Sequence, residues 1–336
     1  MSVMNPLSPE PVAATPGRPF AGQEYGRVHD GTYFKNWNPL MLASELETGK
    51  IVGKDFLGTR VIVYRDDEGR PVVQSAYCPH VGADLSGGEL IEGQVRCPYH
   101  HWQFARDGRC AKIPGETHIP RAARIYNYPA AERWGLIWAF NGETPLFDLP
   151  EMPNLAEEDL VYRAFHRGQR EIEGWIGSSN LVDFQHLSTV HGIPDPNPVS
   201  VVFDDYLITV RQESATRIAD TKLWGGTWLT AHMQFPNGSE RLFMAGSSQV
   251  RPGWSDAFFV VAMRRSQAEE MGEQATQEEL ASRIAYMHKL YSEDEPILFN
   301  LRFRGYGKSA LLRADKYFGQ FLQYLEKYPR AAPFDV

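Results

Sequence analysis

Apolar and polar residues alternate in short runs along the first part of the chain, from about residue 33 to residue 140. Alternation with a period of two is typical of strands that bury one face, and the Gly, Asp and Pro residues between the runs indicate turns. The pattern predicts strands at residues 59–64, 71–77, 125–128 and 134–140. We therefore expect an all-β unit here, with a turn at residues 66–69 between the first two strands.

The second part of the chain mixes helical and strand periodicity. Alternating runs between residues 199 and 265 predict strands, a short helix is expected near residues 174–191, and a longer helical stretch is expected from about Thr276. The Pro-rich segment 145–153 is typical of a linker. The sequence thus predicts an α+β protein in three parts: a loose N-terminal arm (1–30), an all-β domain (31–147) and a second domain (148–336).

Composition narrows the possible functions. The 336 residues carry a net charge of −8, which argues against a surface for nucleic acid or for an anionic membrane. The sequence has no run of about eighteen apolar residues and no apolar leader, so we expect no membrane span, no signal peptide and a cytoplasmic protein. Only three Cys are present, which excludes a disulfide framework, and Cys110 is expected to be a small buried hydrophobic residue.

Two short motifs each pair a Cys with a His. Cys78 and His80 stand in Cys-Pro-His, and Cys97 and His100 stand in Cys-Pro-Tyr-His. Two Cys and two His are the ligands of a Rieske 2Fe–2S cluster, in which imidazoles replace two thiolates on one iron and raise the reduction potential. Zinc could use the same four residues, but structural zinc sites usually pair Cys with Cys and His with His. The sequence therefore predicts a Rieske cluster on two hairpin loops, with His101 outside the ligand set.

A second motif, at residues 180–191, carries two further histidines. Asp183 and His186 are three residues apart and would share one face of a helix. His186 and His191 are five apart, so the helix must bend or end near Gly192 for both to reach one ion. Two His and one carboxylate form the facial triad of non-haem Fe(II) oxygenases, which leaves coordination positions open for O2 and substrate. Two ordinary core or surface histidines are the alternative.

The carboxylate of such a triad has to come from elsewhere in the chain. Asp294 is the candidate, because it lies in an acidic step within an otherwise apolar stretch. Glu293 and Glu295 are competitors, and acidic residues at this place could instead cap a helix N-terminus. Pro296 is expected to break or restart the helix here.

Together these motifs resemble those of the large (α) subunit of Rieske non-haem iron ring-hydroxylating oxygenases, over nearly the whole chain. The resemblance implies an antiparallel sheet flanked by helices, of the helix-grip or START-like kind, in the second domain. It implies a 2Fe–2S cluster bound by Cys78, His80, Cys97 and His100, and a mononuclear non-haem Fe(II) bound by His186, His191 and Asp294. In the head-to-tail homotrimer of this family, Asp183 would bridge His100 of one subunit to His186 of the next. Asn180 would lie near the iron, and His101 stands where the family often has Gly or Asp.

The same resemblance implies an activity. The chain would be a terminal oxygenase component that takes electrons from a separate ferredoxin or flavin reductase. It would use O2 to hydroxylate or oxidatively demethylate a bulky apolar small molecule that is aromatic, steroid or terpenoid-like. Its length is more like that of the monooxygenases and demethylases. A cis-dihydrodiol-forming dioxygenase or a desaturase would use the same ligands, and a Rieske electron-transfer protein with a degenerate second domain is the alternative from another class.

Two larger groups of residues complete the prediction. The substrate pocket is expected among apolar residues of the second domain, most of which would be plain core: Trp224, Trp228, Met233, Phe235, Phe243, Met244, Phe258 and Met263. A docking surface for an acidic ferredoxin is expected among Arg65, Arg70, Arg96, Arg106, Arg109 and Lys112, although solvated hairpin tips would explain the same charges. No Arg or Lys stands out as an anchor for a carboxylate group of the substrate.

Overall fold

Small antiparallel sheets make up the N-terminal part of the molecule. The computed structural model describes residues 23–24, 27–28, 30–194, 196, 198–299, 301, 307 and 309–333, and most of the predicted arm 1–30 lies outside them. The strands are β1 (Gln23–Glu24), β2 (Arg27–Val28), β3 (Tyr33–Phe34), β4 (Trp37–Leu42), β5 (Val52–Phe56), β6 (Thr59–Arg65), β7 (Pro71–Ser75), β8 (Glu89–Ile91), β9 (Gln94–Arg96), β10 (Gln103–Phe104), β11 (Cys110–Lys112), β12 (Asn127–Tyr128), β13 (Ala130–Arg133) and β14 (Leu136–Phe140). They form sheets of order β12-β7-β6-β5, β13-β14-β4 and β11-β10-β9-β8, and the pair β1-β2. The predicted all-β unit is confirmed.

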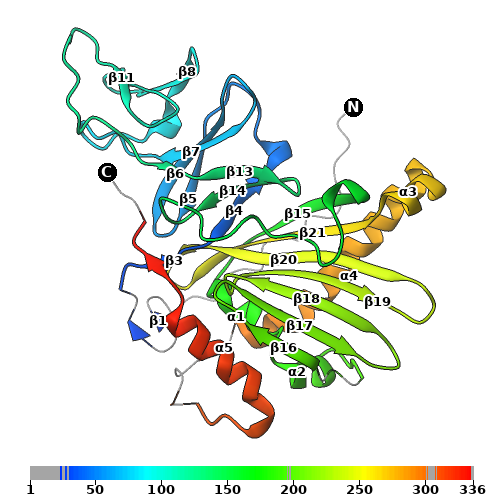
Figure 1. The fold of residues 1–336 in the computed structure, drawn as a ribbon. Helices are drawn as coiled ribbons and strands as arrows, with labels where there is room; N and C mark the ends of the chain where they lie inside the picture. The colour runs from blue at the N-terminus through cyan, green and yellow to red at the C-terminus, as the bar shows by residue number, and fades with distance from the viewer. Residues whose placement is uncertain are drawn as a thin grey trace.

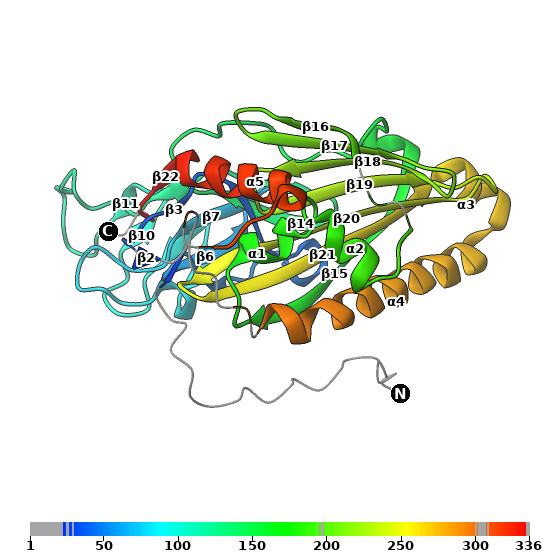
Figure 2. The same cartoon turned by 90° about the horizontal axis from the view of Figure 1, so that it is seen from below.

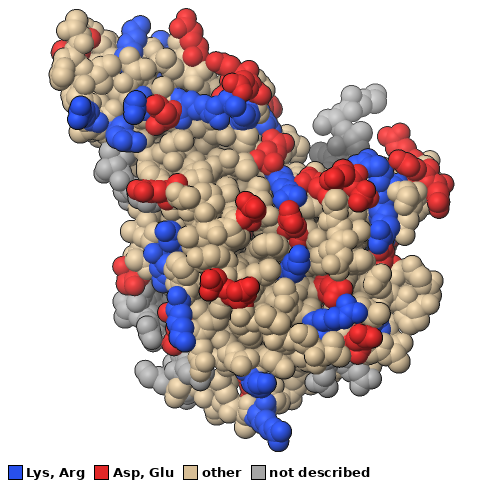
Figure 3. Space-filling view, in the orientation of Figure 1, with Lys and Arg blue, Asp and Glu red and all other residues tan. Residues whose placement is uncertain are grey.

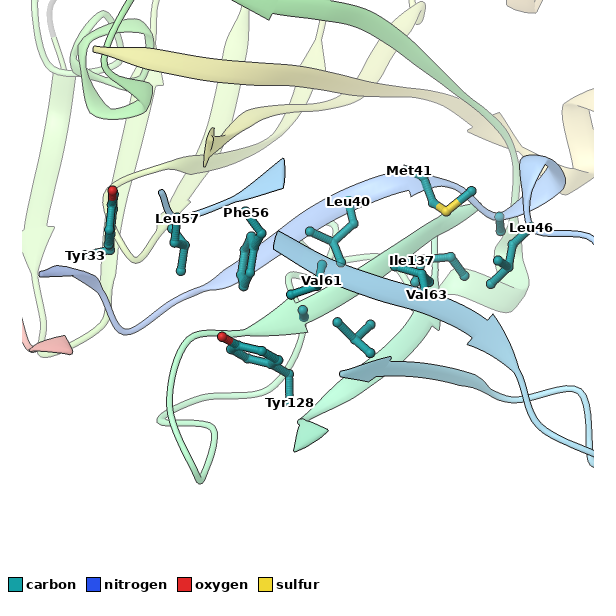
Figure 4. Packing of buried hydrophobic residues seen from close by; sticks show 13 residues of the cluster. Tyr33, Leu40, Met41, Leu46, Phe56, Leu57, Val61, Val63, Tyr128 and Ile137 are labelled. Atoms are coloured by element: carbon teal, nitrogen blue, oxygen red, sulfur yellow. The ribbon is translucent and has the colours of Figure 1, made fainter. Parts of the chain in front are cut away.

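Alternating buried side chains hold these sheets together. Val61 and Val63 on β6 are fully buried and point into one core with Phe56 of β5, Tyr128 of β12 and Ile137 of β14 (Figure 4). The rings of Phe56 and Tyr128 meet edge to face, with 5.5 Å between their centroids. This core supports the hairpin of β6 and β7, from whose end the first Cys-His loop departs. The prediction of that hairpin from the sequence is confirmed.

A seven-stranded antiparallel sheet forms the second part of the molecule (Figure 1). Its strands are β15 (Leu160–Arg170), β16 (Pro198–Phe203), β17 (Leu207–Glu213), β18 (Ile218–Trp224), β19 (Trp228–Gln234), β20 (Glu240–Arg251) and β21 (Trp254–Arg264), in the order β15-β21-β20-β19-β18-β17-β16. On β18 buried and half-buried residues alternate, as expected for a strand whose two faces differ. The predicted α+β class is confirmed.

Helices cover the face of this sheet that points away from the N-terminal part (Figures 1 and 2). They are α1 (Gly174–Ser179), α2 (Phe184–Thr189), α4 (Glu273–Leu298) and α5 (Lys316–Lys327), while α3 (Arg265–Met271) follows the end of β21. Short 3-10 helices lie at Ala43–Glu45, Leu85–Gly87, Glu157–Asp159 and Arg313–Asp315. The single helix predicted near residues 174–191 was wrong. There are two helices, because Asp183 starts a new one by accepting a hydrogen bond from the backbone N–H of His186 at 3.2 Å.

Pro296 does not interrupt α4. It lies within the last turn of the helix, which continues to Leu298, and Phe299 still donates its backbone N–H to Glu295 at 3.0 Å. A proline removes one intrahelical N–H, and near a helix end this leaves few later bonds to disturb. The predicted break at Pro296 was therefore wrong, and the acidic residues before it stand on a continuous helix.

The two parts pack together across the other face of the sheet. Trp138 of β14 and Trp228 of β19 are buried and meet edge to face, with 4.7 Å between their ring centroids. Asn36 donates its Nδ2–H to the carbonyl of Gly225 at 2.6 Å, and a Cβ at Gly225 would lie 1.9 Å from Oδ1 of Asn36. Near the C-terminus, β22 (Arg330–Ala331) pairs with β3. The proposed boundary between residues 147 and 148 stays a prediction.

Candidate functional site

The first candidate site lies at the tip of the N-terminal part, where the two Cys-His loops face each other. Cys78 and Cys97 are buried, with 2% and 1% of their surface exposed, whereas His80 and His100 are exposed. The two imidazole rings lie 4.5 Å apart between centroids, and His80 stacks on Trp102 at 4.6 Å. The four side chains therefore converge with the thiols inside and the imidazoles at the surface.

Backbone hydrogen bonds shape both loops. Cys78 donates its N–H to Ala83 at 2.9 Å and Cys97 donates its N–H to Trp102 at 2.8 Å. His101 closes the second loop with a φ of +59°, in the left-handed region that favours glycine. A non-glycine residue in this conformation is uncommon, and His is among the residue types that adopt it more often. The sequence did not reveal that conformation.

Burial governs the chemistry of the Cys78 thiol. It raises the pKa of Cys78 to about 12, opposed by a hydrogen bond from the backbone N–H of His80 and supported by the neighbouring Cys97 thiol. A thiol in such surroundings becomes a thiolate at neutral pH only when a bound cation stabilises the charge. Two buried thiols beside two exposed imidazoles fit the ligand set of a 2Fe–2S cluster, with one iron held by sulfur and the other by nitrogen.

The second candidate site lies between α2 and α4. α2 ends at Thr189, and the chain turns at Gly192, where φ is +64°, so His191 returns towards His186. The ligand atoms of His186, His191 and Asp294 all lie within 4.8 Å of one another, and Nε2 of His191 is 3.2 Å from Oδ1 of Asp294. The end of the helix near Gly192, which the sequence analysis required, is confirmed.

Each of these three side chains has a second polar atom that points away from the common site, and neighbouring groups form hydrogen bonds with these atoms. Nδ1 of His191 lies 2.9 Å from Oε2 of Glu293, and Nδ1 of His186 bonds to the backbone carbonyl of Asp183. Asn180 donates its Nδ2–H to Oδ2 of Asp294 at 3.1 Å. Both Nε2 atoms and one carboxylate oxygen are thus left facing a common point, which is the arrangement that metal-binding histidines adopt.

The three adjacent acidic residues of α4 have different partners. Glu295 pairs with Arg167 at 2.8 Å and with Arg170 at 3.3 Å, and Glu293 contacts His191 from outside. Asp294 alone of the three joins the two histidines. Burial raises the pKa of Asp294, while the nearby His191 and His186 lower it. A divalent cation at this point would remove the cost of burying that carboxylate. The role of Glu293 was not foreseen, because only the packing of α4 reveals it.

A cavity of about 110 Å³ opens beside this site. Its lining is mostly apolar and comes from α1, α2, α4, α5 and the segments that follow α1, α2 and α4: Trp175, Ile176, Ser179, Asn180, Asp183, His186, Val190, Asp294, Ile297, Leu298, Leu301 and Phe318. None of the eight residues predicted for the substrate pocket lines it. Trp228, Met244 and Phe258 pack on the other face of the sheet, and Phe243 lines a separate cavity beside α4. Apolarity alone does not tell which face of a strand a residue occupies, and the place of the substrate pocket among the eight stays a prediction.

The basic residues near the cluster loops are largely neutralised. Five of the six form ion pairs: Arg65 with Glu132, Arg70 with Asp66 and Glu68, Arg96 with Glu89, Arg106 with Asp66, and Arg109 with Asp107. Figure 3 shows basic and acidic side chains side by side on this part of the surface. The geometry favours solvated, locally paired hairpin tips over a basic docking surface.

Comparison with known proteins finds similarity first in the N-terminal part of the chain. Residues 36–128 match the family model of the Rieske [2Fe-2S] domain. The chain is 32% identical over 177 residues to cholesterol 7-desaturase nvd of Bombyx mori, covering 51% of this chain and 38% of that protein. It is 29% identical over 209 residues to aminopyrrolnitrin oxygenase PrnD of Pseudomonas fluorescens, covering 60% and 55%. It thus spans about half the length, or less, of the curated relatives it matches.

Solved structures share the fold over most of the chain. The structure of NdmB from Pseudomonas putida CBB5 superposes with a TM-score of 0.73 at 17% identity, covering 87% of this chain and 89% of that one. Dicamba monooxygenase bound to dicamba superposes with a TM-score of 0.69 at 20% identity, covering 88% and 96%. Within the described part of this chain, no helix combines the length and the apolar character that a membrane crossing needs.

Proposed function

From its homology to Rieske non-haem iron oxygenase α subunits, in its Rieske domain and in its overall fold, we propose that this chain is a terminal oxygenase component. It uses O2 and externally supplied electrons to hydroxylate or oxidatively demethylate a bulky small molecule. One observation carries the proposal: the same chain holds a Cys2His2 set on two loops and a His2Asp set between α2 and α4. A Rieske electron carrier needs only the first.

The ligands follow from the two constellations. Cys78 and Cys97 would hold one iron of the 2Fe–2S cluster, His80 and His100 the other, and His186, His191 and Asp294 the mononuclear Fe(II). When bound, the cluster supplies single electrons and the Fe(II) supplies O2 activation. The chain's own residues provide the apolar cavity beside the triad, which would receive the part of the substrate that is oxidised and limit water there.

Three residues around the triad have positioning roles in this proposal. Glu293 fixes the ring of His191, and the backbone carbonyl of Asp183 fixes the ring of His186. Asn180 holds the outer oxygen of Asp294, so the inner oxygen stays directed at the metal. The Asp183 carboxylate is the proposed link for electrons arriving from a partner subunit.

The assembly and the redox partner are parts of the same proposal. We infer a head-to-tail homotrimer in which His100 of one subunit approaches Asp183 of the next. The support is the tip of the cluster domain, where Tyr77, Val81 and Tyr99 are 39%, 59% and 65% exposed around the loops. Exposed apolar side chains grouped in this way are typical of interfaces. A separate ferredoxin or flavin reductase would supply the electrons, and the three unpaired cysteines fit a reducing cytoplasm.

The proposed activity is tested by product mass. The reduced, iron-loaded protein is mixed with 18O-labelled O2 and a panel of aromatic ethers, steroids, terpenoids and N-methyl heterocycles. One labelled atom in the product identifies a hydroxylase, and a lost methyl group identifies a demethylase. Two labelled atoms with two added hydrogens would instead identify a dihydrodiol-forming dioxygenase, and a loss of two hydrogens a desaturase. If no compound gives a product and the mononuclear iron is absent, the result would favour the Rieske electron-transfer protein instead.

Cys78→Ser is expected to abolish cluster binding. A serine hydroxyl is a hard ligand that does not replace a thiolate on an iron–sulfur cluster. The purified variant should lose acid-labile sulfide and visible absorption together. Cys110→Ser is the matched control, because the Cys110 thiol is also buried but stands on β11, outside the two Cys-His motifs, and contacts the carbonyl of Lys112 at 3.5 Å. A Cys78→Ser protein with normal absorption would remove Cys78 from the ligand set.

Glu293→Gln is expected to weaken Fe(II) binding at the triad by about 10–100-fold, because an anionic partner on the outer nitrogen makes His191 a stronger ligand. The measurement is the Fe(II) dissociation constant of protein that retains its cluster, so that the visible spectrum reports folding independently. Glu279→Gln on the same helix, where Glu279 pairs with Arg283 at 2.7 Å, is the control. Equal affinities in the three proteins would show that Glu293 does not position the ligand.

A further inference from the structure

Arg217 is a buried cation for which the described part of the chain provides no counter-charge. It immediately precedes β18, is 7% exposed, and donates from Nη2 to Oε1 of Gln212 at 3.1 Å. Its Nε is buried without a hydrogen-bond partner, and no described Asp or Glu forms an ion pair with it. Burial without a counter-charge is costly, and burial accordingly lowers the pKa of this guanidinium. Such a group needs an explanation beyond the stability of the fold.

The surrounding backbone holds Arg217 rigidly in place. The tight turn between β17 and β18 is closed by the backbone bond from Ser214 N–H to the carbonyl of Arg217 at 2.9 Å. Gln212 accepts the hydrogen bond from the Arg217 guanidinium. It also donates its own Nε2–H to the carbonyl of Pro196, in the segment that follows His191. The arginine is therefore fixed before any ligand binds, and it is tied to the chain that carries one of the proposed iron ligands.

Strand register puts Arg217 on the same face of the sheet as the helices. Gln212 pairs with Ala219, so the two residues share a face, and Arg217, two residues before Ala219, points the same way. Further along that face of β18, Leu223 is buried among Trp175 and Ile176 of α1, which line the cavity beside the triad. Arg217, Ala219 and Leu223 thus share the helix-covered face of the sheet, on which α1 also packs beside the proposed iron site.

A second arginine without an ion pair lies nearby. The guanidinium carbon of Arg241 on β20 is 3.9 Å from the ring centroid of Tyr286 on α4, and no described carboxylate pairs with it. Both residues line a cavity of about 300 Å³ between the sheet and α4. Arg217 also interacts electrostatically with Tyr286, so this ring lies near both cations. Tyr286 lies eight residues before Asp294 on α4, which corresponds to about 12 Å along the helix axis at a rise of 1.5 Å per residue.

We propose that Arg217, assisted by Arg241, binds an anionic group of the substrate, so that the enzyme acts on an amphipathic organic anion such as a carboxylate. The inference rests on the proposed function, since it assumes that the apolar body of the same molecule reaches the His186, His191 and Asp294 site. A bidentate carboxylate would pair with the unsatisfied Nε and a neighbouring N–H of Arg217. Arg217 does not stand out in the sequence as an anchor for a carboxylate, because nothing in the chain marks this arginine as buried.

The test measures binding to the intact, metal-loaded protein by calorimetry, with no turnover. The probes are benzoate, naphthalene-2-carboxylate, biphenyl-4-acetate and lithocholate, each beside its methyl ester, which has the same body without the charge. At least one acid should bind wild-type protein about tenfold or more tightly than its ester. Arg217→Gln should remove that difference and leave the ester's affinity unchanged, whereas Arg217→Lys should keep part of the preference.

Arg211→Gln is the matched control. Arg211 lies one strand away on the opposite face and pairs with Asp220 at 2.8 Å, so its replacement should leave the preference for the acid intact. Thermal unfolding separates a structural role from a binding role: Arg217→Gln should melt no lower than wild type, because it removes an uncompensated buried charge. The inference is overturned if no acid binds more tightly than its ester, if Arg217→Gln keeps the preference, or if the variant unfolds.

Failure of this inference and failure of the proposed function give different results. Oxygenation of neutral compounds by a protein with no preference for acids would refute the anion site and leave the oxygenase proposal standing. Tight, Arg217-dependent binding of acids by a protein that oxidises no compound would refute the oxygenase proposal and leave the anion site standing.

Discussion

His186→Ala is expected to yield a protein that keeps the colour of its cluster but forms no product. The triad supplies three ligand atoms within 4.8 Å of one another, and without the imidazole only His191 and Asp294 remain, 3.2 Å apart. Two protein ligands do not hold Fe(II) firmly against loss to solvent, whereas the cluster loops lie in a separate sheet and are unaffected. Iron content should fall from three to two per chain, and turnover should drop by at least about 1,000-fold.

The same variant separates the two main functional hypotheses. A Rieske electron carrier would not need His186. Unchanged iron content and unchanged electron acceptance in the variant would therefore favour the electron-carrier hypothesis. His118→Ala, at an exposed histidine in a loop of the N-terminal part, is the control and should retain three irons and full activity. If His186→Ala retained turnover, His186 would not be an iron ligand.

The cluster loops could be predicted from the sequence because their chemistry is local. The spacing of Cys78 and His80, and that of Cys97 and His100, fixes which side chains share a loop, and the adjoining hairpins have clear alternating patterns. Structure adds what spacing does not contain: the thiols are inside, the imidazoles are outside, and His101 adopts a left-handed backbone.

The third ligand of the triad illustrates why contacts between distant parts of the chain are harder to predict from the sequence. Glu293, Asp294 and Glu295 follow one another on α4, and consecutive helical residues point about 100° apart. Only one of them can face His186 and His191, and the sequence does not state which face of α4 packs against the sheet. The structure separates them, with Glu293 behind His191 and Glu295 beside Arg167.

The lining of the cavity beside the triad could not be predicted for a related reason. Both faces of the seven-stranded sheet are apolar, since helices cover one and the N-terminal part covers the other. An alternating pattern gives the period of a strand but not which face meets which layer. Trp228 therefore looked like a pocket residue although it packs on Trp138, and Arg217 looked like an ordinary turn residue although it is buried.

Asp183→Asn is expected to leave both metal centres intact and to slow electron transfer between them. The Asp183 side chain accepts a hydrogen bond from the N–H of His186 at 3.2 Å and caps α2, a helix of only six residues. Asparagine is an equally good N-cap, and the backbone carbonyl that holds Nδ1 of His186 is unchanged. Metal content and thermal stability should therefore match wild type.

What Asp183→Asn removes is the negative charge beside His186. In the proposed trimer that carboxylate accepts a hydrogen bond from His100 of the partner subunit, and the neutral amide would weaken this charge-assisted bond. After reduction of the cluster, its reoxidation on adding O2 and substrate should slow by about 100-fold or more, as followed by stopped-flow absorbance. Asp183→Ala, which also loses the cap at a cost of about 1 kcal/mol, should lose iron as well. A wild-type reoxidation rate in Asp183→Asn, with full metal content, would show that electrons reach the triad by a route that does not need this carboxylate.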